Sequence, residues 1–111
     1  MESHAKVVVI GGGVVGCSIL YHLSKFGLKD CILLERKELT SGSSWHAAGN
    51  VHVISSDPNI SRMMAYTIRL YKEIEQESGH SVGFKPSGGF YLASNDVWAD
   101  YLKRERSKAR Y

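Results

Sequence analysis

The first third of the chain alternates short apolar runs with a glycine-rich turn and a helical pattern. The run from Val7 to Ile10 predicts a buried strand that leads into three consecutive glycines. Apolar positions then recur at helical spacing from Val14 to Phe26, and Gly27 follows as a C-terminal cap. A second apolar run from about Cys31 to Leu34 predicts another strand. The order strand, helix, strand predicts a βαβ unit with parallel strands and hence an α/β fold.

A long amphipathic helix is predicted near the middle of the chain. Asp57 suits its N-cap, and Pro58 suits its first turn, where a missing N–H does no harm. Gly79 is the expected end of this helix. One face carries six apolar residues, which we interpret as packing residues: Ile60, Met63, Met64, Ile68, Tyr71 and Ile74.

The remaining third predicts two short strands and a last helix. The segment "GFKPSGGFYLAS", residues 83–94, predicts a strand, a Pro/Gly turn and a second strand with Phe90 and Leu92 on one face. Asn95 can cap the helix that follows. The apolar side of that helix is expected to consist of Val97, Trp98, Tyr101 and Leu102.

Composition and charge narrow the classes of function. With 43% hydrophobic and 23% charged residues, the chain has the composition of a soluble globular protein. Its net charge of +3 comes from residues 103–111, which hold five basic side chains and one acidic one, and removing them leaves 9 basic against 10 acidic residues. Because no basic stripe or patch remains, we expect no nucleic-acid partner.

The two cysteines and the lengths of the apolar runs indicate in which cell compartment the protein lies. Cys17 and Cys31 are too few for a disulfide framework and lack CxxC spacing, which favours a reducing compartment. The longest apolar run, Val7 to Ile10, is too short to cross a bilayer, and the opening "MESHAK" resembles neither a signal peptide nor a transit peptide. These features predict a cytoplasmic protein without a membrane partner.

A glycine fingerprint lies where the first strand is expected to meet the first helix. Gly11 permits a tight turn, Gly13 removes a side chain that would block a pyrophosphate, and Gly16 lets helix and strand pack closely. Glu35 ends the second strand, where a carboxylate can bind the ribose hydroxyls of an adenosine, while the helix N-terminus offers N–H groups to phosphates. The pattern predicts a site for the adenosine diphosphate that NAD and FAD share. The predicted site also includes Val14, Val15 and Arg36.

A loop rich in small residues, "TSGSSWHAAGN" (residues 40–50), follows the second strand. A dinucleotide lying across the strand ends would run along this loop, whose hydroxyls and backbone N–H groups suit phosphate and sugar oxygens. The predicted contacts are Thr40, Ser41, Gly42, Ser43 and Ser44, followed farther along the ligand by Trp45, His46 and Gly49.

These segments resemble known flavoproteins. "VVVIGGGVVGCSILYHLSKFGLKDCILLER", residues 7–36, is similar to the FAD-binding start of glutathione-reductase-type flavoproteins, which implies a Rossmann-like βαβ domain. "LTSGSSWHAAGN" is similar to a loop of the dimethylglycine dehydrogenase and sarcosine dehydrogenase family, FAD-dependent oxidoreductases of the D-amino-acid-oxidase-like superfamily. "VGFKPSGGFYLAS" resembles a strand pair of the same family, so the resemblance covers essentially the whole chain.

The resemblance implies FAD as the cofactor, no metal, and oxidation of N-methyl groups. In that family the loop histidine is joined covalently to the 8α carbon of the flavin, and the matching residue is His46. A neutral imidazole nitrogen is a competent nucleophile near pH 7, which agrees with that role. The implied reaction moves a hydride from an N-methyl carbon of an amine such as dimethylglycine or sarcosine to the flavin. The one-carbon unit leaves as formaldehyde or passes to tetrahydrofolate, and an electron-transfer flavoprotein or oxygen takes the electrons.

The chain is expected to be the N-terminal part of a longer FAD-binding oxidoreductase domain. Residues 1–36 would form the dinucleotide-binding unit, 37–56 the flavin-binding loop, 57–79 a helix, and 80–111 the start of a strand pair and a helix. The residues that bind the amine, and any folate domain, would lie beyond the last residue, so this chain alone is not expected to turn over substrate. If the source is eukaryotic, the mitochondrial matrix is the alternative location.

Three other interpretations fit parts of the same pattern. A non-covalent FAD amino-acid oxidase would share the glycine fingerprint and leave His46 unattached. A truncated, non-enzymatic module would bind a nucleotide or a protein partner without stoichiometric flavin. An NAD-linked dehydrogenase fits less well, because it assigns no role to residues 40–50.

Overall fold

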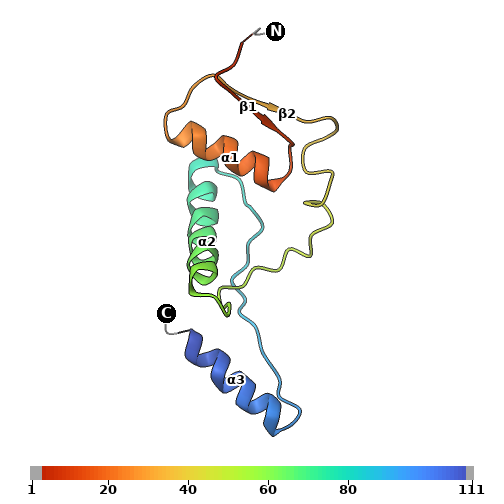
Figure 1. The fold of residues 1–111 in the computed structure, drawn as a ribbon, viewed down its shortest axis with the longest axis vertical. Helices are drawn as coiled ribbons and strands as arrows, with labels where there is room; N and C mark the ends of the chain where they lie inside the picture. Colours follow the sequence, from red (N-terminus) through yellow and green to blue (C-terminus); the bar gives the residue numbers. More distant parts are fainter. Residues whose placement is uncertain (1–3, 110–111) are drawn as a thin grey trace. The chain divides into compact units, whose positions relative to one another are not determined.

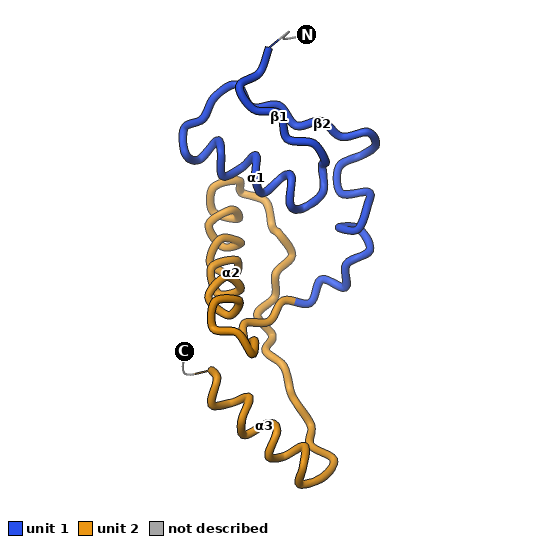
Figure 2. The backbone as a smooth tube through the Cα atoms, viewed as in Figure 1, with its two compact units in different colours: residues 1–50 blue, residues 51–111 orange. Residues whose placement is uncertain are grey.

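The computed structural model describes residues 4–109. Its elements follow in the order β1, α1, β2, α2 and α3 (Figure 1). They divide into two compact units, the first ending at Asn50 and the second beginning at Val51 (Figure 2). Unit 1 holds both strands and the first helix, whereas unit 2 holds the two later helices.

Unit 1 is a βαβ unit. β1 spans Val7–Ile10 and β2 spans Cys31–Leu34, and the strands pair in parallel, with Val7 opposite Cys31 and Ile10 opposite Leu34. A tight turn cannot join parallel neighbours, so the chain crosses between them through α1, Val14–Lys25. The predicted order of strand, helix and strand is confirmed. α1 ends one residue before the predicted Phe26, which is its C-cap.

The residues after α1 explain why the helix stops there. Gly27 has a φ of 81°, a conformation that residues with a Cβ rarely adopt. Its N–H donates to the carbonyl of Ser24 at 2.9 Å, and the N–H of Leu28 donates to the carbonyl of Leu23 at 3.0 Å. The two bonds form a Schellman motif, which satisfies carbonyls that the helix end leaves free. The predicted glycine cap is therefore confirmed.

The contact between α1 and β1 depends on Gly16. A Cβ placed there would lie 1.8 Å from the carbonyl oxygen of Gly11 and 3.5 Å from Cγ1 of Val9. Only a hydrogen atom fits at this position, so the backbones of the helix and of the strand end approach each other closely. Val9 is 8% exposed and is the buried apolar residue of unit 1 among those described. The core of unit 1 therefore lies between α1 and the sheet.

In unit 2, α2, Pro58–Ser78, is the long helix that the sequence predicts. At its start, Oδ1 of Asp57 accepts hydrogen bonds from the N–H groups two and three residues along, at 2.7 and 3.2 Å. At its end, Gly79 adopts a φ of 70°, and its N–H donates to the carbonyl of Glu75 at 3.0 Å. Both predicted caps are confirmed. Leu70, at 8% exposure, is the buried apolar residue on this helix.

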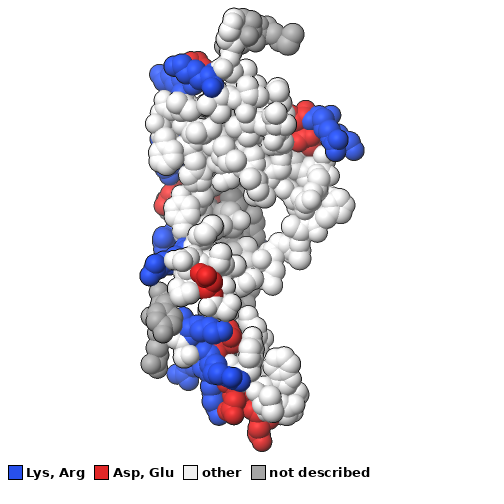
Figure 3. All heavy atoms as spheres, in the orientation of Figure 1, with Lys and Arg blue, Asp and Glu red and all other residues white. Residues whose placement is uncertain are grey.

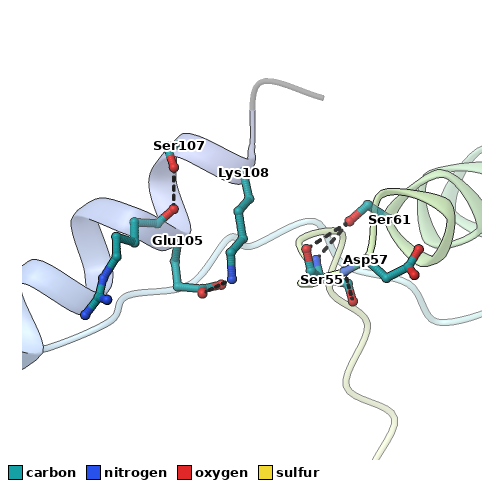
Figure 4. Close-up of polar contacts among 7 residues, drawn as sticks. Ser55, Asp57, Ser61, Glu105, Ser107 and Lys108 are labelled. Atoms are coloured by element: carbon teal, nitrogen blue, oxygen red, sulfur yellow. Dashed lines mark hydrogen bonds and ion pairs between the residues drawn. The ribbon is translucent and has the colours of Figure 1, made fainter.

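The chain that enters α2 is held by serine hydroxyls (Figure 4). The N–H of Ser55 donates to Oγ of Ser61 at 2.9 Å, and the N–H of Asp57 donates to Oγ of Ser55 at 3.3 Å. These bonds fold the approach segment back onto the first turn of the helix, so local polar contacts define where α2 begins.

α3, Asp96–Lys108, also begins at its predicted cap. Oδ1 of Asn95 accepts the N–H of Trp98 at 3.0 Å. The rings of Trp98 and Tyr101 meet edge to face, with centroids 5.5 Å apart. Even so, Val97, Trp98 and Tyr101 remain exposed, so this pair of rings forms a small cluster at the surface.

The charges of α3 pair with one another along its surface. Nζ of Lys103 lies 2.8 Å from Oδ1 of Asp100. Lys108 forms an ion pair with Glu105 (Figure 4). Figure 3 shows basic and acidic side chains together at this end of the chain. The Lys103–Asp100 pair is exposed, and pairs at this spacing stabilise a helix by only about 0.2–0.5 kcal/mol. Among the described residues, no helix combines the length and apolar content needed to cross a bilayer.

The predicted strand pair in residues 83–94 is wrong: this segment, described throughout, contains no strand. Phe90 and Leu92, expected on one face of the second strand, are 98% and 91% exposed. An alternating pattern forms a strand only where another backbone edge pairs with it, and two strands by themselves are marginal in water. Gly83 and Gly88 also adopt positive φ, which turns the backbone away from a continuous extended path.

We expect Gly16→Ala to disrupt unit 1, because its Cβ would strike backbone rather than a movable side chain. Overpacked sites lose about 1–3 kcal/mol, and we expect the upper end of that range here. The free energy of unfolding in urea, followed by circular dichroism, measures the effect. Gly89→Ala is the control, since its Cβ meets no atom within 4 Å. Equal midpoints of urea unfolding for the two variants would contradict the packing argument.

Candidate functional site

The glycine fingerprint lies between β1 and α1, as the sequence predicts. Gly11 has a φ of 108°, and its N–H donates to the carbonyl of Leu34 at 2.8 Å, which extends the pairing of the strands by one residue. Gly13 is the N-cap of α1 and has an extended backbone. The N–H groups of the first turn, from Val14 onward, therefore face the point where the strands end.

Gly12, which the fingerprint does not single out, is also part of the site. It is buried, and a Cβ there would lie 2.5 Å from Cδ2 of Leu39 and 3.0 Å from Cβ of Glu35. Its N–H donates to Oε2 of Glu35 at 2.7 Å. The run of three glycines was a usable signal, because the fingerprint itself requires glycine only at Gly11 and Gly13 of that run.

Glu35 follows β2, and its carboxylate faces the turn formed by the three consecutive glycines, residues 11–13, which we call the glycine turn. Oε2 accepts the N–H of Gly12 at 2.7 Å, and Oε1 accepts the N–H of Lys37 at 2.9 Å. The hydrogen bond from Gly12 is the main cause that lowers the pKa of Glu35 below its usual 4.5, and the bond from Lys37 lowers it further against a small opposing effect of burial. Each carboxylate oxygen can accept more than one hydrogen bond, so Glu35 keeps capacity for ribose hydroxyls.

The loop segment 39–46 is hydrogen-bonded to the glycine turn at two points. The N–H of Thr40, which has a φ of 64°, donates to the carbonyl of Gly12 at 2.8 Å. The N–H of Val14, at the start of α1, donates to Oγ of Ser44 at 2.9 Å. The structure thus brings Ser44 and Thr40 to the fingerprint, and it adds Leu39, which the sequence analysis does not name.

His46 is held within its own loop. Its Nδ1 lies 2.9 Å from the carbonyl oxygen of Gly42. A carbonyl can only accept a hydrogen bond, so Nδ1 carries the hydrogen and the neutral ring keeps its lone pair on Nε2. The side chain is exposed, which leaves Nε2 accessible. His46 is therefore oriented as a potential nucleophile through Nε2.

The other predicted residues lie around this arrangement. Trp45 is 77% exposed, and its N–H donates to the carbonyl of Thr40 at 3.0 Å, closing a turn. Within residues 4–109, Trp45, His46, Arg36 and Gly49 make no hydrogen bond to the glycine turn. The exposed members of the predicted set are Val14, Val15, Arg36, Ser41, Gly42, Ser43, Trp45, His46 and Gly49. No group of three His, Cys, Asp or Glu side chains in the described part of the chain is placed to hold a metal ion.

The arrangement fits an adenine dinucleotide. The start of α1 leaves backbone N–H groups without partners in the helix and adds a positive dipole end, and both features suit a phosphate. Glu35 supplies acceptors at the strand end for ribose, while Ser44 supplies a hydroxyl at the helix start. These groups could bind and orient a ligand, and none of them is placed to carry out a chemical step on it.

Comparisons with known proteins match nearly the whole chain. The family described as DAO, FAD dependent oxidoreductase, matches residues 6–111. Human mitochondrial dimethylglycine dehydrogenase is 42% identical over 107 residues, which cover 96% of this chain and 12% of that protein. Human mitochondrial sarcosine dehydrogenase is 43% identical over 105 residues, covering 94% and 11%. The 4-methylaminobutanoate oxidase (formaldehyde-forming) of Paenarthrobacter nicotinovorans is 41% identical over 102 residues, covering 92% and 12%. The chain thus spans about an eighth of each relative.

We expect Glu35→Gln to weaken unit 1 in a pH-dependent way. Because folding lowers the pKa of Glu35, its carboxylate stabilises the fold at pH values above its usual 4.5, and this stabilisation is lost as pH falls through the lowered value. The urea midpoints of wild type and variant should therefore differ at neutral pH and converge in acid. Glu38→Gln, which removes the same charge from the exposed loop, is the control. A difference between wild type and Glu35→Gln that is constant with pH would refute this role.

Proposed function

Because this chain belongs to the DAO family of FAD-dependent oxidoreductases, we propose that its unit 1 holds FAD for the oxidation of N-methyl amines. The observation that carries the proposal is the attachment of the loop segment 39–46 to the glycine turn, through Thr40 and Ser44. It joins a dinucleotide-binding turn to a loop that ends in an accessible imidazole. We propose further that unit 1 is the start of a Rossmann-like domain of the glutathione-reductase type.

Each part of the site suits one part of the cofactor. The backbone N–H groups of Gly13, Val15 and Gly16 would hold the pyrophosphate, because the first turn of a helix leaves such groups without intrahelical partners and its dipole favours an anion there. Glu35 would accept the ribose hydroxyls of the adenosine half. When bound, FAD supplies the capacity to accept two electrons, and the protein positions it.

The substrate class follows from what the relatives' names share. Dimethylglycine, sarcosine and 4-methylaminobutanoate all combine an N-methyl amine with a carboxylate. We therefore propose an N-methylated amino acid as the substrate. Removal of hydride from its N-methyl carbon leaves an iminium, which water hydrolyses to formaldehyde and the demethylated amine. Alternatively, the one-carbon unit is transferred to tetrahydrofolate. In either case an electron-transfer flavoprotein or oxygen accepts the two electrons from the flavin.

The proposed location follows the same relatives. Both human proteins are mitochondrial by name. Their names support the mitochondrial alternative and leave the cytoplasmic prediction without support, so we propose the mitochondrial matrix for a eukaryotic source.

We propose that His46 carries the flavin through Nε2. The hydrogen bond between Nδ1 and the Gly42 carbonyl supports this assignment, since it leaves the lone pair on Nε2. Attachment forms an Nε2–C8α bond, releases two protons and two electrons overall, and requires an electron acceptor such as oxygen. A covalent bond would retain the cofactor even if the predicted contacts from Trp45 and Gly49 to the flavin did not form.

The purified flavin-containing full-length protein should therefore yield a flavin adduct on its tryptic peptide Glu38–Arg62 after acid denaturation. Mass spectrometry with fragmentation places the adduct, because the peptide contains both His46 and His52. We expect the adduct on His46, its loss in His46→Ala, and its retention in the matched variant His52→Ala. Free FAD in the acid supernatant with an unmodified peptide would identify a non-covalent oxidase. Absence of stoichiometric flavin would identify a non-enzymatic module.

A further inference from the structure

The first turn of α1 needs an acceptor that its own N-cap cannot supply. The first N–H groups of any helix lack partners within the helix, and a serine, threonine, asparagine or aspartate at the N-cap usually accepts one of them. Here the N-cap is Gly13, which has no side chain. Oγ of Ser44, thirty residues along the chain, accepts the N–H of Val14 at 2.9 Å instead. A distant loop residue thus performs the capping.

We propose that Ser44 is a positioning residue that fixes His46 relative to the phosphate-binding end of the site. This inference rests on the proposed function, because it concerns the placement of the flavin-linked histidine. Ser44 acts through His46, which follows it by two residues, and its hydroxyl sets where the loop meets α1.

Hydrogen bonds hold the loop both at the helix start and beside the imidazole. Ser44 is held by the N–H of Val14, the N–H of Trp45 donates to the carbonyl of Thr40 at 3.0 Å, and Nδ1 of His46 bonds to Gly42. Thr40 is itself held, since its N–H donates to the carbonyl of Gly12 at 2.8 Å. The segment is therefore fixed near both ends, and the imidazole extends from a turn with little freedom to move.

Gly13 supports this role. A Cβ at Gly13 would lie 3.3 Å from Oγ of Ser44, a separation tighter than ordinary van der Waals contact. Any side chain there would push the hydroxyl away from the helix start. The second glycine of the fingerprint thus makes room for Ser44 as well as for a phosphate.

The chemistry of a hydroxyl suits a place beside a phosphate. A carboxylate cap at the same position would repel an anion, whereas serine caps the N–H without adding charge. The oxygen of Ser44 accepts from Val14 and keeps its own hydrogen available to donate. Ser44 therefore fixes the loop without opposing the ligand that we propose for the turn.

The test compares Ser44→Ala, Ser44→Thr and a control, Ser24→Ala, an exposed serine in the last turns of α1. Apo-protein is mixed with FAD, and the adduct on peptide Glu38–Arg62 is followed over time by mass spectrometry. Misplacement of a reacting group by about 1 Å slows reactions by up to about a hundredfold, so we expect attachment in Ser44→Ala to be at least about tenfold slower. Ser44→Thr should restore most of the rate, and Ser24→Ala should match wild type.

Nuclear magnetic resonance of the apo-protein provides a readout that needs no flavin. In Ser44→Ala, the Val14 amide should exchange faster with solvent and the ring signals of His46 should shift, whereas Ser44→Thr should restore both. A capping role without positioning predicts faster exchange at Val14 but unchanged His46 signals and an unchanged attachment rate, and that result would overturn the proposal. If wild type holds only unattached FAD, the proposed covalent bond fails, and the His46 signals alone then decide for or against Ser44.

Discussion

The close approach of α1 to the turn after β1 is the contact on which the rest of unit 1 depends. At Gly16 a Cβ would lie 1.8 Å from the carbonyl oxygen of Gly11, so helix and turn meet backbone to backbone. This contact brings the first turn of α1 to the ends of both parallel strands, where the positive φ of Gly11 reverses the chain. The N–H groups of the first turn lack partners within the helix and lie beside this space, and that of Val14 is capped by Ser44. A larger residue at Gly16 would remove the site along with the packing.

Two polar residues from distant parts of the chain complete the turn, and they differ in charge. Glu35 bonds to the N–H of Gly12 at the strand end, and Ser44 bonds to the N–H of Val14 at the helix start. A carboxylate suits neutral ribose hydroxyls and repels phosphate, whereas a hydroxyl can accept from a ribose hydroxyl or donate to a phosphate oxygen. If the site holds FAD as we propose, the separation of these two groups gives it a direction, with the sugar at β2 and the phosphate at α1. This direction is consistent with an FAD-dependent family, in which His46 would lie farther along the ligand.

Unit 2 owes its helices to local contacts rather than to a large core. Asp57 and Asn95 cap the two helices, and Leu70 is the buried apolar residue among those described in this unit. Phe90 and Leu92 stay exposed in a segment that has an alternating pattern but no neighbouring backbone edge. Contiguous exposed apolar residues mark surfaces that other structure covers. Unit 1 is different, since its strands pair with each other and its helix closes over them.

The sequence by itself determined every feature that depends on neighbours a few residues apart. It predicted β1, α1, β2 and α2, together with the caps at Gly27, Asp57, Gly79 and Asn95, because strand pattern, helical spacing and capping chemistry are all local. It also placed Gly11, Gly13 and Gly16 where β1 leads into α1, and Glu35 after β2, since the fingerprint encodes its own backbone path. The same local pattern failed in residues 83–94, where forming a strand requires a partner that the pattern cannot supply.

Only the tertiary structure decided the contacts between residues far apart in the chain. Gly12 meets Glu35 across 23 residues, and Val14 meets Ser44 across thirty. No periodicity relates such positions, because their distance depends on how α1 packs on the sheet and on where the loop returns. The close approach of the Leu39 side chain to Gly12 depends on the same packing. Sequence identified the chemical groups of the site, and folding brought them together, since a hydrogen bond requires atoms within about 3 Å of each other and only a packed backbone sets that distance.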